Sequence, residues 1–507
     1  MPKRHKNLFH TISREQFEEA VQNLHQRIPR LARHEIILEM ARIVAMVGDG
    51  HTNIYPTRDP KIGFHTLPIK LYLFKDGFFI RAAEKEDAGL VGARVIRIGK
   101  LSTQQAVARV REIIGHDNEM GVKFFAPQLL VMPEVLHGLE ITDDLEAAAV
   151  VIEKNGQEQT VLLHPSGLAE IMPSDVDLSW MSKEGWVDMR DGAKTQPPLW
   201  LQDPQNKFWF EYLPESRAVY VQINQVGDKE TETLAAFSKR LFAFVDSSKA
   251  EKLVLDLRLN RGGNGTLLPP LVAEIIRSPL NRPGRLFTII GRSTFSAAQF
   301  LVNDLERYSN TLFVGEPSGS KGNSYGDSRK IMLPNSGLTV RVSIYYWQDW
   351  YPWDTRPWTA PHLTAELTSE QYRTNSDPAM KLILNYVLQK PLGELLEEAF
   401  AKKDVELAKR RFRMFRNDPV NLYYNVQEEM FGLGQRLLRK EKLDYAIEVL
   451  NLNAEADPQS WITYEALSDL YAARKDKELA IKSLETALKL NPKNSELKEK
   501  LNQLKQR

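Results

Sequence analysis

The chain has 507 residues, 67 of them basic and 66 acidic, and 42% of it is hydrophobic. This length predicts several domains, and the near balance of charge argues against nucleic-acid or membrane-surface binding through a basic patch. The absence of cysteine excludes disulfides, thiolate catalysis and zinc–thiolate sites.

Residues 1–60 predict an N-terminal helical segment. Ser13 directly precedes an amphipathic run, and Gln16 lies three residues after Ser13, which is the spacing of a capping box. A second helical run ends at Gly48 and leads into the turn "GDGHTN". The first residues are basic and then polar, with no apolar signal core. Because the chain opens almost at once on a capped helix, we expect Met1 to lie inside a longer reading frame.

Residues 65–165 predict a β-rich module of short strands. The piece "AGLVGARVIRIGKLS" (88–102), followed by a helix, resembles the carboxylate-binding end of a PDZ domain, although the usual Gly-Asp reads Gly92-Ala93. If this module binds a peptide tail, we expect "LVGARVIRI" to form part of the groove by β-addition. Residues 118–145 predict helix, and Asn155-Gly156 predicts a hairpin turn.

Residues 198–390 predict an α/β domain. Strand-like runs such as "AVYVQIN", "KLVLDLR", "RLFTII" and "TLFVGE" alternate with helical runs, which is typical of a largely parallel sheet. Residues 420–507 predict an all-α domain with a 34-residue period, because Ala446, Leu450 and Pro458 recur as Ala480, Leu484 and Pro492. A period of this length resembles that of tetratricopeptide repeats. The alternative interpretation is an unrelated helical tail. Two repeats are few for an independent solenoid, so we expect them to dock on the α/β domain or on another subunit.

Three stretches of the α/β domain carry chemistry. In "LVLDLRLNRGGNG" a buried strand is followed by Gly262-Gly263, a pair that lets backbone N–H groups approach a substrate. In "TFSAAQ" Ser296 opens a helix, where it is either a nucleophile beside a free N–H of Ala297 or an ordinary N-cap. In "VGEPSGSKGNSYGD" Lys321 lies in a flexible loop, and a desolvated lysine beside a serine can act as a general base.

These stretches, in this order, resemble the tail-specific proteases, also called C-terminal processing peptidases. Asp256, Arg258, Asn260, Gly262 and Gly263 match the family's Asp-x-Arg-x-Asn-x-Gly-Gly segment. Ser296 falls on the nucleophile, and Lys321, 25 residues later (321 − 296), falls on the general base. The resemblance implies a crotonase/Clp-like α/β core preceded by a PDZ-like module. It covers about residues 208–385 and does not extend to the repeats.

The chain departs from the family pattern at two positions. Gln299 replaces the usual Glu of the serine motif, and Tyr325 replaces the Gln that helps to orient the lysine. The loop is closer to a branch that reads Gly-Glu-Pro-Thr-Gly-Gly, whose tricorn-like members use a histidine base. His51, in the "Asp-x-His-Thr" turn beside Asp49, is that candidate, and Asp354 is a candidate for the acid that orients it. The mechanisms Ser296–Lys321 and Ser296–His51 both remain open.

The resemblance implies a serine endopeptidase that hydrolyses protein or peptide substrates through a Ser296 acyl-enzyme, with Gly262 or Gly263 and Ala297 as oxyanion donors. The rival hypotheses are a catalytically inactive peptide-binding scaffold and acyl-CoA chemistry on the same fold. We expect no cofactor, no metal site and no nucleic-acid partner, because no His-Glu-x-x-His pattern or phosphate loop occurs. The repeats predict a protein partner or self-association. The family resemblance and the lack of cysteine favour an extracytoplasmic location. The aromatic segment 344–358 predicts either a substrate cleft or a core edge.

Overall fold

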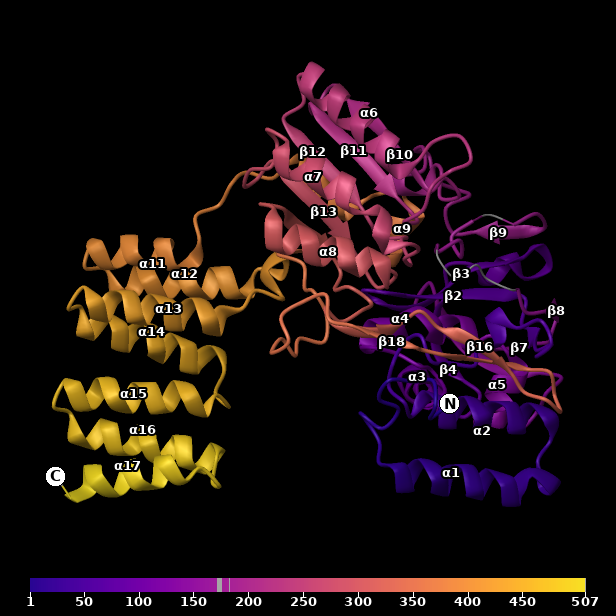
Figure 1. Cartoon of the computed structure of the whole chain (residues 1–507), viewed down its shortest axis with the longest axis horizontal. Helices are drawn as coiled ribbons and strands as arrows, with labels where there is room; N and C mark the ends of the chain where they lie inside the picture. Colours follow the sequence, from indigo (N-terminus) through magenta and orange to yellow (C-terminus); the bar gives the residue numbers. More distant parts are fainter. Residues whose placement is uncertain (171–175, 182, 507) are drawn as a thin grey trace. The chain divides into compact units, whose positions relative to one another are not determined.

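The computed structural model describes residues 1–170, 176–181 and 183–506. The chain divides into two compact units, Met1–Pro361 with Ala365–Tyr386 and His362–Thr364 with Val387–Arg507. Figure 1 shows a mixed α/β protein whose last unit is helical. No helix in the described part of the chain is long and apolar enough to cross a membrane.

The first unit opens with two helices, α1 (Arg14–Arg27) and α2 (Arg33–Ala45). The predicted capping box of α1 is confirmed, because the side chain of Ser13 accepts from the backbone of Gln16 and the side chain of Gln16 accepts from the backbone of Ser13. The chain after α2 forms the turn that carries His51, and an isolated bridge from Asn53 to Arg341 ties it to a distant hairpin.

The β-rich module is an antiparallel sheet in the order β2-β3-β4-β6-β7, with β5 on β4 and β9 on β3. The hairpin predicted at Asn155-Gly156 is confirmed, and both residues have positive φ angles, 54° and 75°. The strands are β2 (Ile69–Phe74), β3 (Gly77–Glu84), β4 (Arg94–Ile98), β5 (Leu101–Ser102), β6 (Ala148–Lys154), β7 (Gln157–Leu163) and β9 (Trp186–Asp188). A short pair, β1 (His65–Thr66) with β8 (Gly167–Leu168), lies outside this sheet.

Three helices belong to the same module, α3 (Thr103–Arg111), α4 (Glu119–Leu129) and α5 (Pro133–Gly138). The expectation that "LVGARVIRI" offers an edge for β-addition is wrong, because its strand β4 already pairs with β3 on one side and β6 on the other. The edge strands are β2, which pairs only with β3 among the described residues, and β7, which pairs only with β6 among them.

The second sheet carries the predicted alternation of strands and helices. Strands β11 to β14 run parallel in sequence order and β10 joins antiparallel at one side. Every residue of β11 and β13 is buried, as expected for strands covered on both faces. The elements are β10 (Phe208–Leu213), β11 (Ala218–Ile223), α6 (Leu234–Ser247), β12 (Lys252–Asp256), α7 (Pro269–Arg277), β13 (Leu286–Ile290), α8 (Ala297–Tyr308) and β14 (Leu312–Gly315).

After this sheet the chain forms two small hairpin-like pairs and two short helices. The pairs are antiparallel, β15 with β18 and β16 with β17. Apolar residues of β17 belong to the core of the β-rich module, so this excursion returns to the N-terminal part of the unit. The elements are β15 (Ser324–Gly326), β16 (Arg329–Met332), β17 (Thr339–Val342), β18 (Tyr345–Trp347), α9 (Ser369–Arg373) and α10 (Pro378–Leu384).

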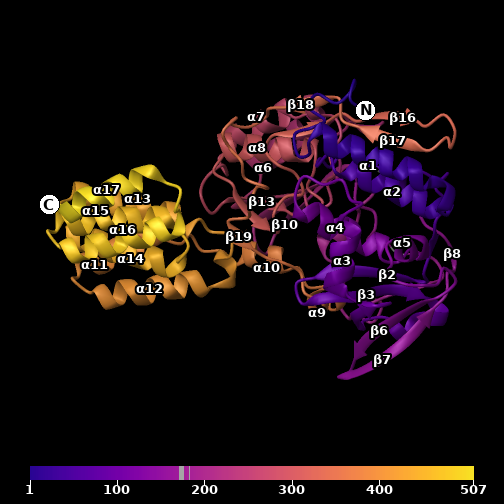
Figure 2. The ribbon, with the colours of Figure 1, turned by 90° about the horizontal axis from the view of Figure 1, so that it is seen from below.

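The second unit consists of helical hairpins (Figure 2). Ala446 and Ala480, one predicted period apart, are both fully buried. Two helices that the sequence analysis did not predict, α11 and α12, precede the repeats and share their core. The elements are β19 (Leu363–Thr364), α11 (Leu392–Ala401), α12 (Val405–Asn417), α13 (Val426–Arg439), α14 (Leu443–Ala456), α15 (Trp461–Ala473), α16 (Lys477–Leu490) and α17 (Ser495–Gln506).

Candidate active site

Ser296 lies at the turn between β13 and α8, at the carboxyl end of a parallel strand. Its backbone has φ 57° and ψ −125°, a combination that residues other than glycine rarely adopt. Its side chain makes no capping hydrogen bond to α8. The turn therefore holds the Ser296 hydroxyl away from the helix end, which is the arrangement of an exposed nucleophile rather than of an N-cap.

His51 lies next to this hydroxyl. Its Nε2 is 3.0 Å from Ser296 Oγ, and its ring stacks on the ring of Phe295 with centroids 4.5 Å apart. Gly50 is required here, since a Cβ at that position would lie 2.8 Å from the Phe295 ring. Burial lowers the pKa of His51 to about 4, and the nearby Asp49 charge offsets only part of this shift. The imidazole is therefore neutral at neutral pH and can accept the serine proton.

Asp49 shapes the turn that presents His51. One carboxylate oxygen accepts from the backbone N–H groups of His51 and Thr52, at 2.8 and 2.7 Å, and from the Ser343 hydroxyl at 2.8 Å. The other lies 3.0 Å from His5 Nε2. Burial raises the pKa of Asp49, but the hydrogen bonds from His5, Ser343 and Thr52 outweigh burial and hold it below its ordinary value. Asp49 is thus a turn former and not a partner of the His51 ring.

The second ring nitrogen of His51, Nδ1, is buried and has no hydrogen-bond partner among the described residues. Asp354 accepts instead from Trp350 Nε1 at 2.5 Å and from the backbone and side chain of Arg356, each at 2.8 Å. Lys321 is exposed and makes no hydrogen bond to Ser296 within the described part of the chain. Of the two candidate bases, the geometry brings only His51 to the Ser296 hydroxyl, and the candidate orienting acid Asp354 makes no hydrogen bond to the His51 ring.

The turn after β12 approaches the same serine. A Cβ at Gly262, whose φ is 117°, would lie 2.7 Å from Ser296 Cβ and 3.1 Å from Ala297 N. The N–H of Gly262 donates to Asn260 Oδ1 at 2.9 Å, whereas no described residue accepts from the N–H of Gly263 or Ala297. These two N–H groups remain available to a developing oxyanion.

Asn260 holds this turn and the serine turn together. Its side chain is fully buried and donates to Ile223 O at 3.0 Å while it accepts from Gly262 N. Its carbonyl accepts from Phe295 N at 3.1 Å. One residue therefore sets the spacing between the glycine pair and the segment that precedes Ser296.

Two buried acidic groups anchor the surrounding loops. Asp117 accepts from Gly50 N and from Ser320 Oγ, both at 2.8 Å, and so joins the histidine turn to the loop of Lys321. Burial raises the pKa of Asp117, and its hydrogen bonds offset only part of this effect. Glu316 forms a bidentate pair with Arg292 at 2.6 and 2.7 Å. Sequence reasoning missed Asp117, His5 and Ser343, because no local spacing relates them to the serine.

The two departures from the family pattern have structural partners. Gln299 is fully buried and donates to Asn303 and Thr359, both at 2.9 Å, so it fastens α8 rather than facing the nucleophile. The Tyr325 ring packs against His5 and His10 with centroids 4.6 and 4.5 Å away. Both replacements therefore serve packing.

The aromatic segment 344–358 divides between surface and interior. Trp350 is buried, while Trp353 is 75% exposed and Trp347 is 39% exposed. Trp347 packs against Phe300 with centroids 5.6 Å apart. A Cβ at Gly326 would lie 3.1 Å from Trp347 Cδ1 and 3.9 Å from His51 Cε1, so the Trp347 ring lies near His51. Part of the segment therefore lies near His51 and part of it is core.

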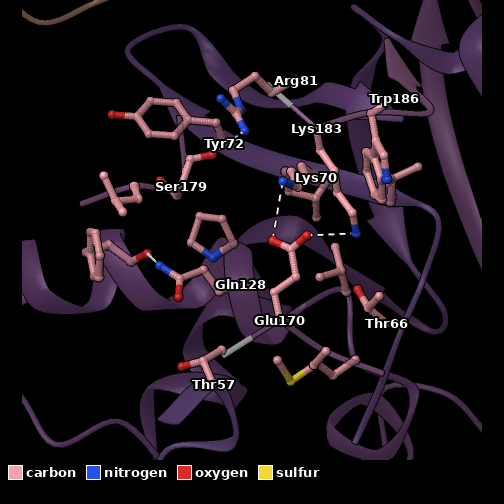
Figure 3. A pocket seen from close by; sticks show the side chains of 18 of the residues that line it. Thr57, Thr66, Lys70, Tyr72, Arg81, Gln128, Glu170, Ser179, Lys183 and Trp186 are labelled. Carbon is pink, nitrogen blue, oxygen red and sulfur yellow. Dashed lines mark hydrogen bonds and ion pairs between the residues drawn. The ribbon is translucent and has the colours of Figure 1, made fainter. Parts of the chain in front are cut away.

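A separate pocket of about 420 Å³ lies in the β-rich module (Figure 3), between β2, α4 and the segment before β9. Two lysines meet one carboxylate there, with Lys183 2.8 Å and Lys70 3.5 Å from Glu170. Trp186 lies under both ammonium groups. The pocket thus combines an excess of positive charge with the open edge of β2.

No family model and no curated protein matches the sequence of the chain. Solved structures do match its fold. Mature CPAF complexed with lactacystin is 12% identical with a TM-score of 0.50, and the match covers 75% of this chain and 96% of that one. The photosystem II D1 C-terminal processing protease is 13% identical with a TM-score of 0.31, covering 75% of this chain and 98% of that one. The first TPR of Spaghetti (RPAP3) matches 23% of this chain and 88% of its own, at 22% identity and a TM-score of 0.16.

CPAF and the D1 processing protease are both tail-specific proteases. At such low identity the likeness to CPAF concerns the fold alone, and it extends over three quarters of the chain. The resemblance first indicated by the serine and glycine motifs is thereby confirmed at the level of architecture: in fold, this chain resembles the tail-specific proteases.

Proposed function

We propose that the chain is a serine endopeptidase in which Ser296 is the nucleophile and His51 the general base. The observation that carries the proposal is the 3.0 Å approach of His51 Nε2 to Ser296 Oγ. The hydroxyl gives its proton to Nε2 as Oγ attacks a peptide carbonyl, and the Gly263 and Ala297 N–H groups stabilise the oxyanion. His51 then returns the proton to the leaving amine, and water hydrolyses the acyl-enzyme.

The Ser296–His51 mechanism is favoured over Ser296–Lys321. A lysine serves as a base only when desolvation lowers its pKa. Lys321 is exposed, and the carboxylate of Asp117 interacts with it electrostatically. Its side chain is therefore open to solvent, and within the described part of the chain it makes no hydrogen bond to Ser296.

The alternative function is a peptide-binding scaffold without catalysis, and one observation favours it. When Nε2 accepts the serine proton, Nδ1 must carry the ring N–H, and Nδ1 has no acceptor among the described residues. Serine proteases of the triad type place a carboxylate there. We assign Asp354 no such role, because Trp350 and Arg356 already occupy its oxygens.

We further propose that the pocket of Figure 3 binds the carboxyl-terminal tail of a peptide substrate. The open edge of β2 suits an added strand, and the excess charge of Lys70 and Lys183 over Glu170 suits a terminal carboxylate. A fluorescent peptide with a free carboxyl terminus should bind more tightly than its amidated form, and Lys70→Gln should reduce that difference.

Labelling with a fluorophosphonate probe tests the catalytic proposal. Wild-type protein should be labelled, and Ser296→Ala and His51→Ala should not, provided that both retain the wild-type circular dichroism spectrum. A well-folded wild type that resists labelling over the whole accessible pH range would favour the scaffold.

A further inference from the structure

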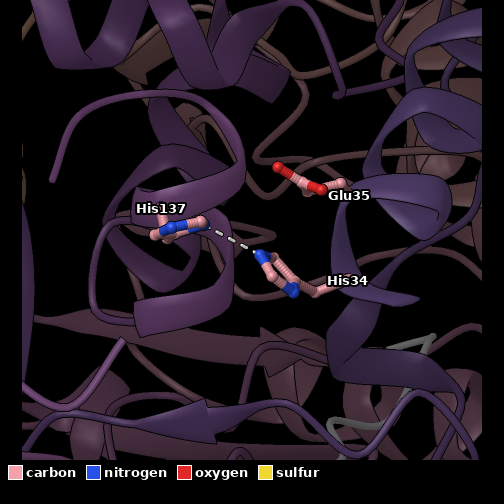
Figure 4. Close-up of side chains that lie close together, drawn as sticks. All are labelled: His34, Glu35 and His137. Atoms are coloured by element: carbon pink, nitrogen blue, oxygen red, sulfur yellow. Dashed lines mark hydrogen bonds between the residues drawn. The ribbon is translucent and has the colours of Figure 1, made fainter. Parts of the chain in front are cut away.

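Two histidines and a glutamate from two separate helices lie side by side, away from Ser296 in the sequence (Figure 4). His34 and Glu35 belong to α2 and His137 to α5. His34 Nε2 lies 2.9 Å from His137 Nδ1, and one atom from each of the three side chains lies within 4.8 Å of the others. His34 is buried, while Glu35 and His137 are half-buried.

The packing of α2 on α5 brings these residues together. Gly138, directly after His137, sits where a Cβ would be 2.5 Å from Leu38 Cδ1 and 3.4 Å from His34 Cδ2. The missing side chain lets α5 approach α2 closely enough for the two imidazoles to touch. The ligands lie 103 positions apart, which is why no His-Glu-x-x-His spacing occurs.

We propose that His34, Glu35 and His137 form a binding site for one divalent transition-metal ion of the zinc class. Two imidazoles and a carboxylate are a zinc donor set, with ligand atoms about 2.0–2.2 Å from the ion. Two nitrogens at that distance in a tetrahedral site are about 3.3 Å apart. The observed 2.9 Å requires only that the rings separate slightly.

Glu35 is already oriented for this role. One of its oxygens accepts from Ala32 N at 2.7 Å as part of the capping box of α2. A carboxylate that binds a metal is usually held by a hydrogen bond of this kind. The other oxygen is left to turn toward the histidines.

The site has an entrance. His34 also lines a pocket of about 360 Å³, together with Glu134 and His65. Glu134 accepts from His65 Nδ1 at 2.6 Å and from its backbone N–H at 3.0 Å, which keeps that carboxylate outside the proposed ligand set. The pocket provides room for water to complete a four-coordinate ion.

A bound ion would cross-link α2 to α5. Helix α2 ends at Ala45, six residues before His51, so the ion would brace the element that leads into the histidine turn. Binding to the folded state alone raises stability with metal concentration. The inference is independent of whether the chain is a peptidase.

The test uses the full chain without a histidine tag, stripped of metal by a chelator and titrated with Zn²⁺ in competition with a chromophoric indicator. Wild type should bind one equivalent and unfold at a higher temperature. His34→Gln, Glu35→Gln and His137→Gln should each lose at least about 100-fold in affinity, because removal of an outer-shell partner already costs about 10–100-fold. His25→Gln and His164→Gln, whose side chains lie outside the pocket that His34 lines, should bind as wild type does.

Co²⁺ added to wild type gives a readout that needs no variant. Intense visible bands typical of a four-coordinate ion would support the site, and the weak spectrum of hexa-aqua Co²⁺ would overturn it. Failure of wild type to take up Zn²⁺, or equal uptake by His34→Gln and His137→Gln, would also overturn it.

Discussion

The Nε2 atom of His51 lies 3.0 Å from the Oγ atom of Ser296, although 245 positions separate the two residues. The chain completes the whole β-rich module between them. The N–H of Gly50 donates to Asp117 and the N–H of Phe295 donates to the carbonyl of Asn260, so a distant residue holds each turn. The His51 ring stacks on the Phe295 ring where the two turns meet. The approach of His51 to Ser296 is therefore a product of tertiary packing.

The choice of base predicts opposite results for two variants. His51→Ala should lower kcat/KM by about 10²–10⁴-fold, the usual contribution of a general base, while Lys321→Ala should stay within about twofold of wild type. Hydrolysis of a quenched fluorescent peptide library measures both. Asp354→Asn serves as the matched control, since its loss should not exceed that of Lys321→Ala. Loss in Lys321→Ala with retention in His51→Ala would reverse the assignment.

The lowered pKa of His51 predicts an acid limb near pH 4. The base works only when it is neutral, so the rate of fluorophosphonate labelling should fall as pH drops through about 4 and should be flat from pH 5 to neutrality. An unperturbed histidine would give a midpoint near 6.5. In the unfolded chain His51 binds a proton near its ordinary pKa of about 6.5, whereas in the folded chain it does so only near pH 4. The free energy of unfolding therefore also declines as pH falls below about 6.5. Circular dichroism at each pH separates the two effects, and a midpoint above 6 would indicate an acceptor on Nδ1.

Gly262→Ala should slow labelling of Ser296 although it leaves the Ser296 hydroxyl and the His51 imidazole in the chain. The added Cβ would lie 2.7 Å from Ser296 Cβ at a φ of 117°, so either the serine turn or the glycine turn must move. We expect labelling to slow about 10²-fold or more, since a displaced oxyanion donor has that effect. Gly89→Ala is the control, because its Cβ would meet nothing within 4 Å. If Gly262→Ala and Gly89→Ala had equally small effects on the labelling rate, the close approach of Gly262 to Ser296 would be contradicted.

The buried pair Arg292–Glu316 predicts a large loss of stability when one partner is removed. Glu316→Leu leaves the Arg292 charge buried and should lower the free energy of unfolding by about 3–5 kcal/mol. The double variant Arg292→Met with Glu316→Leu should recover most of this loss. Urea denaturation measures both.

The exposed pair Arg373–Glu370 has the same bidentate geometry, at 2.7 and 2.8 Å, and is the matched control. Glu370→Leu should cost less than about 1 kcal/mol because solvent screens the pair. Similar losses in the free energy of unfolding for Glu316→Leu and Glu370→Leu would show that burial does not determine how much an ion pair contributes to stability.

The alternation of strands and helices was predictable over the parallel sheet, because each strand there is a continuous apolar run. The pairing of β4 on both sides was not predictable, since its partner β6 lies about fifty residues away and strand periodicity does not reveal partners. Helices α11 and α12 were missed because they fall between the resemblance to the peptidases and the 34-residue repeat.

The candidate site was predictable as a set of residue types but not as a set of contacts. Ser296, His51 and the glycine pair stand in short motifs, so each could be named from local sequence. Which base reaches Ser296 depends on how the histidine turn packs against the serine turn. Two further features also depend on elements that are distant in the sequence. One is the absence of an acceptor for His51 Nδ1 among the described residues, and the other is the contact between His34 of α2 and His137 of α5.

The backbone of Ser296 has φ 57° and ψ −125°, a conformation that costs the folded state stability. A non-glycine residue in such a conformation weakens the fold by about 1–3 kcal/mol. Glycine would relieve that strain, so Ser296→Gly should be inactive and more stable than wild type. A chain with no use for the hydroxyl would gain stability by this single substitution, so the serine costs this fold stability that only a role for its hydroxyl offsets.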